Sequence, residues 1–405
     1  MDDNGGMDWQ SSADTVPSAL IPPEQLLSLG KPPVSGAWRD GDPVGRRSFA
    51  SIGALALEAG GELPAVRIAY ETWGTLSPAA DNVVLVPHAM TGDSHVAGPA
   101  GPGHRTPGWW DDIVGPGRAI DTDRFFVVAP NVLGGCQGST GPSGFAPDGR
   151  EWGSRFPYLT VRDQAVAILR LLDELGLPRV AALVGGSMGG MHVLELAALD
   201  PARFASLAVL ASTAATTADQ IALNAVQLDA IRTDEAFEGG DYYDSAEGPH
   251  RGLALARRIA LISYRSADEI NARFGRAAQS RLNPIGRSGR FAVESYLDFH
   301  GNRFTRRFDA NSYLCLTEAM NSHDVGRDRG GVEAALSRID APSLVLGVTS
   351  DRLFPLADQR RIARALPGNV LGDDVVEIDS EFGHDGFLIE SAAVADALRT
   401  LLRSV

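Results

Sequence analysis

Short runs of consecutive apolar residues recur along the chain, and several are separated by stretches with the apolar spacing of an amphipathic helix. Such runs are typical of strands buried on both faces of a parallel sheet. They lie at residues 83–86, from residue 125 onward, and at 180–184, 204–210, 343–348 and 375–378. Helical spacing occupies residues 160–176, 356–366 and 387–402. This alternation predicts the α/β class, with a mostly parallel, doubly wound sheet.

Two parts of the chain depart from that alternation. Residues 49–73 indicate two strands around the turn at Gly60 and Gly61, an antiparallel start to the sheet. After the sixth predicted strand the pattern is mostly helical, and such an insertion would lie over the carboxyl ends of the strands as a lid. We therefore expect a mobile tail at residues 1–45, a core domain at 46–213 and 338–405, and a helical lid domain at 214–337.

Charge and cysteine content narrow the function classes. With 51 acidic against 36 basic residues the net charge is −15, which argues against nucleic acid as a partner. Two cysteines cannot form a disulfide framework, and no Cys or His cluster has metal-ligand spacing, so we expect no metal. No apolar run is long enough to span a membrane, and the acidic start of the chain lacks a signal sequence. These features predict a cytoplasmic protein with no permanently bound cofactor.

Residues 180–194 carry the clearest chemical signal. Gly185, Ser187 and Gly189 fit the pattern G-x-S-x-G, in which a sharp strand-to-helix turn exposes a nucleophilic serine. The turn would also direct N–H groups of the following helix at a bound carbonyl. A glycine-rich turn can also serve packing alone or bind phosphate, but no lysine follows the glycines and no G-x-G-x-x-G is present. The pattern favours covalent catalysis through Ser187.

A serine nucleophile needs a base, and the base needs an acid that orients it. In α/β-hydrolase sheets the acid and then the histidine follow the serine, each in a loop at the end of a strand. Asp351 and His384 each follow a predicted strand in that order. Asp379 and Asp324 remain alternatives for the acid. The sequence therefore predicts a triad of Ser187, Asp351 and His384.

The oxyanion that forms during acyl transfer needs N–H donors. The residue after the nucleophile, Met188, supplies one. The second should come from the loop that follows the strand at 83–86. There we expect the backbone N–H of Met90, with Ala89 as the alternative one position earlier.

Eight segments, taken together and in order, resemble the homoserine O-acetyltransferase family of methionine biosynthesis. They are HAMTGDSH, GWWDDIVGPG, LGGCQGSTGP, GGSMGGM, GLALARRIALISYRS, FDANSYL, GVTSDRLFP and EFGHDGF. The resemblance runs from about Trp38 to the C-terminus. It implies an α/β-hydrolase fold with a helical lid insertion after strand 6, a homodimer formed through the lid, and the triad named above. It also implies acetyl-CoA as co-substrate and L-homoserine as acceptor.

The same resemblance implies roles at the acceptor site. Arg257 looks like the residue that holds the substrate carboxylate, Tyr264 helps to form the pocket, and Asp385 looks like the partner of the substrate ammonium. Arg258 lies beside Arg257, and only one of the two can easily point inward. Relatives that acylate serine or use succinyl-CoA share most of these motifs, and an esterase or thioesterase of the same fold is a further alternative.

Residues 251–307 are strongly basic within an acidic chain. They contain twelve arginines against four acidic residues, a net charge of +8. A basic lid over a serine site would attract a phosphate-bearing carrier such as CoA. A solvated helix surface or an ion-paired dimer contact would explain the same charge.

Overall fold

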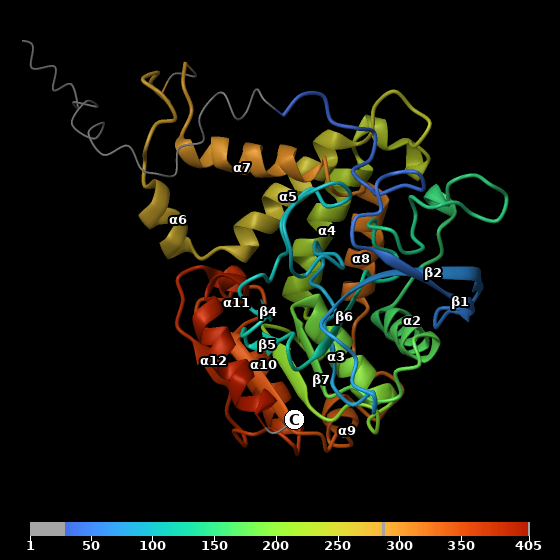
Figure 1. Cartoon of the computed structure of the whole chain (residues 1–405). Coiled ribbons are helices and arrows are strands. Elements are labelled where there is room, and N and C mark those ends of the chain that lie inside the picture. The colour runs from blue at the N-terminus through green and yellow to red at the C-terminus, as the bar shows by residue number, and fades with distance from the viewer. Residues whose placement is uncertain (1–28, 286–287, 404–405) are drawn as a thin grey trace, which may run out of the picture.

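An eight-stranded sheet lies at the centre of the computed structural model, which describes residues 29–285 and 288–403 (Figure 1). Its strands are β1 (Ser48–Ala56), β2 (Glu62–Trp73), β3 (Val83–Leu85), β6 (Phe126–Pro130), β7 (Ala182–Gly186), β8 (Leu207–Leu210), β9 (Ser343–Val348) and β10 (Val376–Ile378). The order is β1-β2-β6-β3-β7-β8-β9-β10. β2 pairs antiparallel with β1 and β6, and the remaining neighbours pair parallel. The predicted α/β fold, with its antiparallel start, is confirmed.

Helices cover both faces of the sheet. The core helices are α2 (Val161–Glu174), α3 (Met188–Leu199), α10 (Leu356–Ala365), α11 (Gly386–Ile389) and α12 (Ser391–Leu402). Val84 and Val184 lie in a core with α12, whereas Val83 and Leu183 lie in another with α2, α3 and α10. Successive side chains of a strand point to opposite faces. A strand covered on both faces therefore needs no polar alternation, which explains the apolar runs.

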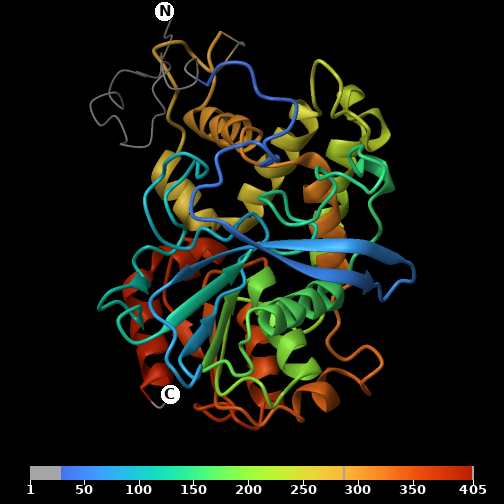
Figure 2. The same cartoon turned by 45° about the vertical axis from the view of Figure 1, so that its right-hand side comes forward.

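Residues 214–337 are hereafter called the insertion. Its helices α4 to α8 group together on one side of the sheet (Figures 1 and 2). The insertion contains α4 (Ala218–Arg232), η2 (Glu235–Gly240), α5 (His250–Tyr264), α6 (Ala267–Phe274), α7 (Ala292–Phe304), α8 (Ala310–Asn321) and α9 (Val332–Leu336). Ile231, Leu253 and Leu316 share a core with Met188 and Met191 of α3, so the insertion packs on the start of α3. α9 instead packs in the core that contains α2, α3 and α10.

Three local features differ from the expectation. The sequence pattern does not predict the short sheet of β4 (Val114–Gly115) and β5 (Ile120–Asp121), nor the 3-10 helices η1 (Gly153–Arg155) and η3 (Gly383–Asp385). The expected helix at 387–402 is two helices, because the backbone at Glu390 leaves the helical region (φ −80°, ψ 53°). Within the described residues, no helix combines the length and apolarity that a membrane span requires.

The chain makes packed contacts before the expected boundary at residue 46. Residues 1–28 of the expected tail lie outside the described residues, and residues 29–45 contain no helix or strand. Ala37 is buried. The N–H of Gly36 donates to the Phe308 carbonyl at 3.2 Å, and that of Trp38 donates to the Cys136 carbonyl at 2.9 Å. This segment is therefore held between the insertion and the loop after β6.

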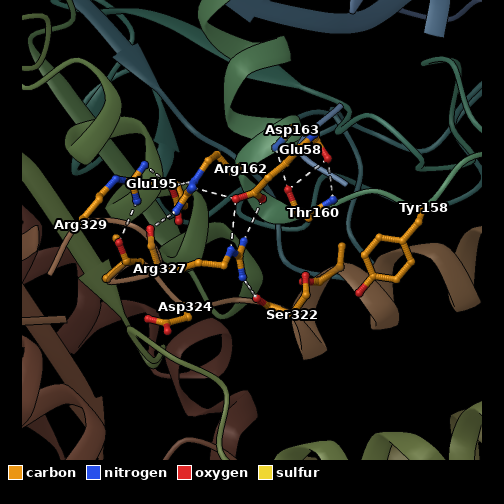
Figure 3. A network of polar contacts seen from close by, with 12 residues as sticks. Glu58, Tyr158, Thr160, Arg162, Asp163, Glu195, Ser322, Asp324, Arg327 and Arg329 are labelled. Atoms are coloured by element: carbon orange, nitrogen blue, oxygen red, sulfur yellow. Dashed lines mark hydrogen bonds and ion pairs between the residues drawn. The ribbon is translucent and has the colours of Figure 1, made fainter. Parts of the chain in front are cut away.

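A network of ion pairs joins the chain after α8 to the core (Figure 3). Glu195 of α3 is 1% exposed and pairs with Arg162 of α2 at 3.3 Å and with Arg329 at 2.8 Å. Glu58, in the turn between β1 and β2, pairs with Arg162 at 2.7 Å and with Arg327 at 2.8 Å. The network thus connects the β1–β2 hairpin, α2, α3 and the end of the insertion.

Candidate active site

Ser187 lies in the turn between β7 and α3, with φ 57° and ψ −125°, a conformation that residues with a side chain rarely adopt. The flanking glycines make this turn possible. A Cβ atom at Gly185 would collide with the Gly189 carbonyl, and one at Gly189 would collide with the Pro87 carbonyl. The G-x-S-x-G pattern is thus a packing requirement that lets α3 lie against the loop after β3.

The side chains of Ser187, His384 and Asp351 form one hydrogen-bonded chain. Nε2 of His384 lies 2.9 Å from Oγ of Ser187, and Nδ1 lies 2.7 Å from Oδ2 of Asp351. The other oxygen of Asp351 accepts the backbone N–H groups of Leu353 and Phe354 at 2.8 and 2.9 Å. All three residues of the chain are buried. The structure therefore brings the predicted triad together.

Both ring nitrogens of His384 are occupied by Ser187 and Asp351. The two residues considered as alternatives for the acid have other partners. Asp379 accepts a hydrogen bond from the Thr349 hydroxyl, and Asp324 accepts the N–H of Gly326. Burial disfavours a protonated imidazole, but the negative charge and hydrogen bond of Asp351 outweigh it, so the pKa of His384 is raised above its ordinary value of 6.5. Raised basicity suits proton abstraction from a serine hydroxyl.

The loop after β3 passes beside the nucleophile. Met90 lines a cavity that Ser187, Tyr264 and Phe354 also line. Met188 is the first residue of α3, so its N–H has no acceptor within the helix. Both expected donor residues therefore lie next to Ser187, whereas Ala89 is not among the described residues that line the cavity.

Arg257 and Arg258 of α5 have different surroundings. Arg258 pairs with Asp298 at 3.0 Å, although its buried Nε has no hydrogen-bond partner, whereas Arg257 has no carboxylate partner among the described residues. The guanidinium of Arg257 lies over the rings of Tyr264 and Phe304, 5.5 and 5.1 Å from their centroids, and its buried Nη1 has no hydrogen-bond partner among the described residues. A buried guanidinium nitrogen without a partner is an open position for an anionic group.

Asp385 directly follows His384, and its carboxylate has a cationic neighbour that sequence reasoning missed. Its Oδ2 lies 3.2 Å from Nε of Arg265, but the N–H is not aligned for a hydrogen bond, so the contact is an ion pair only. Burial raises the pKa of Asp385, while the positive charges of Arg265, His384 and Arg257 oppose that rise. Asp385 therefore lies among cations before any substrate ammonium enters.

Sequence reasoning also missed a polar stripe on α4. Gln220, Asn224 and Gln227 of α4 line the cavity together with Ser187, and so does Thr216, which lies just before the helix. The spacing of four and three residues between Gln220, Asn224 and Gln227 places these three on one side of α4. That spacing was the signal that could have identified them from the sequence.

Glu71, His95 and His104 are the group of described residues whose ligand atoms lie close enough to hold a metal ion, within 4.8 Å of one another. Protein hydrogen bonds already use three of their four ring nitrogens, including Nε2 of His95, which lies 3.3 Å from the Pro99 carbonyl. Nδ1 of His95 lies 2.9 Å from Oε2 of Glu71, and the N–H of Arg46 donates to Nε2 of His104 at 2.9 Å. The two imidazole rings stack with centroids 3.8 Å apart. The expected absence of a metal stays a prediction.

Comparison with known proteins adds a family context. Residues 82–390 match the family described as the alpha/beta hydrolase fold. A homoserine O-acetyltransferase from Leifsonia xyli subsp. xyli is 63% identical over 399 residues, which covers 98% of this chain and 99% of that protein. The crystal structure of homoserine O-acetyltransferase from Bacillus anthracis has a TM-score of 0.80 at 25% identity and covers 88% of this chain and 97% of that chain. A solved esterase has a TM-score of 0.79 at 26% identity, covering 88% and 99%. The chain therefore belongs to the homoserine O-acetyltransferase family, within the α/β hydrolases.

Proposed function

We propose that this protein transfers an acetyl group from acetyl-CoA to the hydroxyl of L-homoserine through an acetyl-Ser187 intermediate. The hydrogen-bonded chain of Ser187, His384 and Asp351 carries the proposal, because it provides an activated nucleophile. Identity of 63% to a homoserine O-acetyltransferase supports the choice of donor and acceptor.

Acylation of the serine is the first half-reaction. His384 takes the proton of Ser187 as Oγ attacks the thioester carbonyl, and the N–H groups of Met90 and Met188 stabilise the oxyanion. When the carbon–sulfur bond breaks, protonated His384 gives its proton to the departing thiolate of CoA. Asp351 keeps the imidazole proton on Nδ1, so that Nε2 is free to accept.

Transfer to homoserine is the second half-reaction and must outrun hydrolysis. His384 deprotonates the homoserine hydroxyl, whose oxygen attacks the carbonyl of the acetyl-enzyme. As the bond between that carbonyl and Oγ of Ser187 breaks, protonated His384 returns the proton to Oγ, which yields O-acetyl-L-homoserine for methionine biosynthesis and the free enzyme. Holding the acceptor at both charged ends gives its hydroxyl the advantage of proximity over water. Arg257 binds the carboxylate, Tyr264 forms the wall beneath that guanidinium, and Asp385 binds the ammonium while it stays paired with Arg265.

Basic side chains beside this pocket support an anionic donor. Burial lowers the pKa of His300 of α7 to about 4, together with the positive charges of four arginines: Arg257, Arg303, Arg273 and Arg265. The histidine is therefore neutral at pH 7, and the positive charge of the cluster comes from the arginines. Such a cluster would attract the phosphates of CoA towards Ser187.

The insertion serves in this proposal as the lid and as the surface through which two copies form a homodimer. Ile221 and Val226 of α4 and Leu255 and Ile262 of α5 support this, since each is an apolar side chain 40–56% exposed. Light scattering should give the mass of a dimer for the wild type and of a monomer for Val226→Asp. The two free, buried cysteines support a reducing compartment such as the cytoplasm.

The deciding experiment crosses acetyl-CoA or succinyl-CoA with L-homoserine or L-serine and measures CoA release. We expect release to require acetyl-CoA and homoserine together. Release that does not depend on the amino acid would indicate the second candidate, an esterase or thioesterase, which the solved esterase neighbour favours. A preference for serine or succinyl-CoA would replace the proposed acceptor or donor.

Mass spectrometry tests the covalent step separately. Protein mixed with acetyl-CoA alone should carry an acetyl group on Ser187. The Ser187→Ala variant should bind acetyl-CoA but form no adduct and transfer nothing. Absence of a wild-type adduct at quench times shorter than one turnover would contradict the two-step mechanism.

A further inference from the structure

His88 lies in the loop that follows β3 and is only 1% exposed. Its Nε2 accepts the N–H of Val132 at 3.0 Å, so the proton of the neutral ring is on Nδ1. Nδ1–H donates to the carbonyl of Ala89, 2.7 Å away. Burial lowers the pKa of His88, which keeps the ring neutral and this tautomer fixed at neutral pH.

The carbonyl of Ala89 and the N–H of Met90 belong to one peptide group. The peptide is trans, so the two bonds point in opposite directions. The N–H of Gly92 also donates to the Ala89 carbonyl, at 2.7 Å. Two donors thus hold this carbonyl on the side of His88, and the Met90 N–H is turned to the other side, where Met90 lines the cavity with Ser187.

The preceding peptide group has the opposite orientation. The carbonyl oxygen of His88 lies against α3, since a Cβ atom added at Gly189 would be 3.3 Å from it. The N–H of the same peptide, that of Ala89, therefore points away from α3 and from Met188. This arrangement favours Met90 over Ala89 as the second oxyanion donor.

We propose that His88 is a positioning residue for acyl transfer, because its Nδ1–H fixes the Ala89–Met90 peptide with the Met90 N–H directed at the oxyanion. The inference rests on the proposed role of Ser187 as nucleophile. His88 acts through the peptide and not on the substrate itself. Its effect should therefore be confined to the transition state, where the oxyanion forms.

Substitution of His88 by asparagine or by glutamine tests its two hydrogen bonds separately. The amide nitrogen of asparagine stands where Nδ1 stands, whereas the amide of glutamine reaches the position of Nε2. We expect His88→Asn to keep kcat for Ser187 acylation within about threefold of the wild type. His88→Gln should lower kcat by about 10- to 100-fold and leave KM nearly unchanged, because a misplaced donor weakens only the transition state.

Acylation is measured with p-nitrophenyl acetate as well as with acetyl-CoA. A wild type that is acylated but transfers nothing to homoserine would refute the proposed function and still allow this test. A boronic acid that forms a tetrahedral adduct with Ser187 should bind His88→Gln more weakly, by about the factor that kcat loses. His323→Gln is the control for loss of a buried histidine, since His323 is 3% exposed and lies outside this loop.

Thermal unfolding establishes that each variant is folded at the assay temperature. Equal loss of kcat in His88→Asn and His88→Gln, or a loss confined to KM, would overturn the proposal. If His88→Asn does not fold, the boronate comparison decides, and undiminished binding by His88→Gln would overturn it.

Discussion

At the scale of single residues, two opposing effects set the basicity of His384: burial lowers its pKa, and Asp351 raises it above 6.5. The base must be unprotonated to act, so activity should fall as the pH drops through that raised pKa. Asp351→Asn removes the main effects that oppose burial and leaves only the negative charge of Asp385 to raise the pKa of His384. We expect the acid limb of the kcat/KM profile to move to lower pH and kcat to fall about 10⁴-fold, because the tautomer is also disturbed. An acid limb that stays in place would contradict this account.

Arg257 and Arg258 offer a matched pair of substitutions. Arg257→Met removes a guanidinium that has an unpartnered nitrogen and, among the described residues, no carboxylate partner. We expect the KM for homoserine to rise about 10- to 100-fold, the cost of losing charge-assisted hydrogen bonds. Arg258→Met, which removes a partner of Asp298, should change that KM by about twofold or less. Steady-state kinetics with varied homoserine measures both, and equal effects would exclude Arg257 as the carboxylate partner.

The sequence was informative about residues whose role depends on chain order. Ser187, Asp351 and His384 follow strand ends, and the carboxyl ends of parallel strands meet at one edge of a sheet, so their meeting could be predicted. The contact of Arg265 with Asp385 joins the residue after α5 to η3, more than a hundred residues further along the chain. No local pattern encodes such a contact.

At the scale of elements, α3 begins at the nucleophile and also carries Glu195 of the ion-pair network (Figure 3). Glu195→Gln would leave Arg162 and Arg329, 15% and 13% exposed, without this countercharge. We expect the free energy of unfolding to fall by about 2 kcal/mol in urea titrations, because removing one partner of a buried ion pair leaves the charge of the other buried and unpaired. Glu333→Gln, whose pair with Arg361 is exposed, should change it by about 0.5 kcal/mol or less. Equal changes would mean that the network does not stabilise α3.

Elements that are longer than about one helical turn, or that are buried on both faces, could be predicted, because the spacing of their apolar residues reflects which side chains are buried. The strand at 343–348 was located to the residue. β4 and β5 have two residues each, too few for any periodicity. The break between α11 and α12 depends on the backbone at Glu390, which apolar spacing does not report.

At the scale of the whole molecule, buried neutral histidines should make the fold sensitive to acid. Burial lowers the pKa of His192 and of His323 to about 3 each. Between the ordinary value of 6.5 and about 3, the unfolded chain binds protons that the folded chain does not, so stability is present above pH 6.5 and is lost as the pH falls through this window. His323→Gln should therefore lose less stability than the wild type between pH 7.5 and 4.5 in urea titrations. An identical loss in the variant and the wild type would show that protonation of His323 does not contribute to the acid sensitivity.

The turn at Ser187 has a consequence for the trade-off between stability and activity. Its backbone, with φ at 57°, stores about 1–3 kcal/mol in a residue that carries a side chain. Glycine adopts such a backbone freely, although it adds entropy to the unfolded chain. Ser187→Gly should thus be inactive but about 1 kcal/mol more stable than the equally inactive Ser187→Ala, and a less stable glycine variant would show that the turn is not strained. Selection for stability alone would discard this nucleophile, and engineering for heat resistance has to hold position 187 fixed.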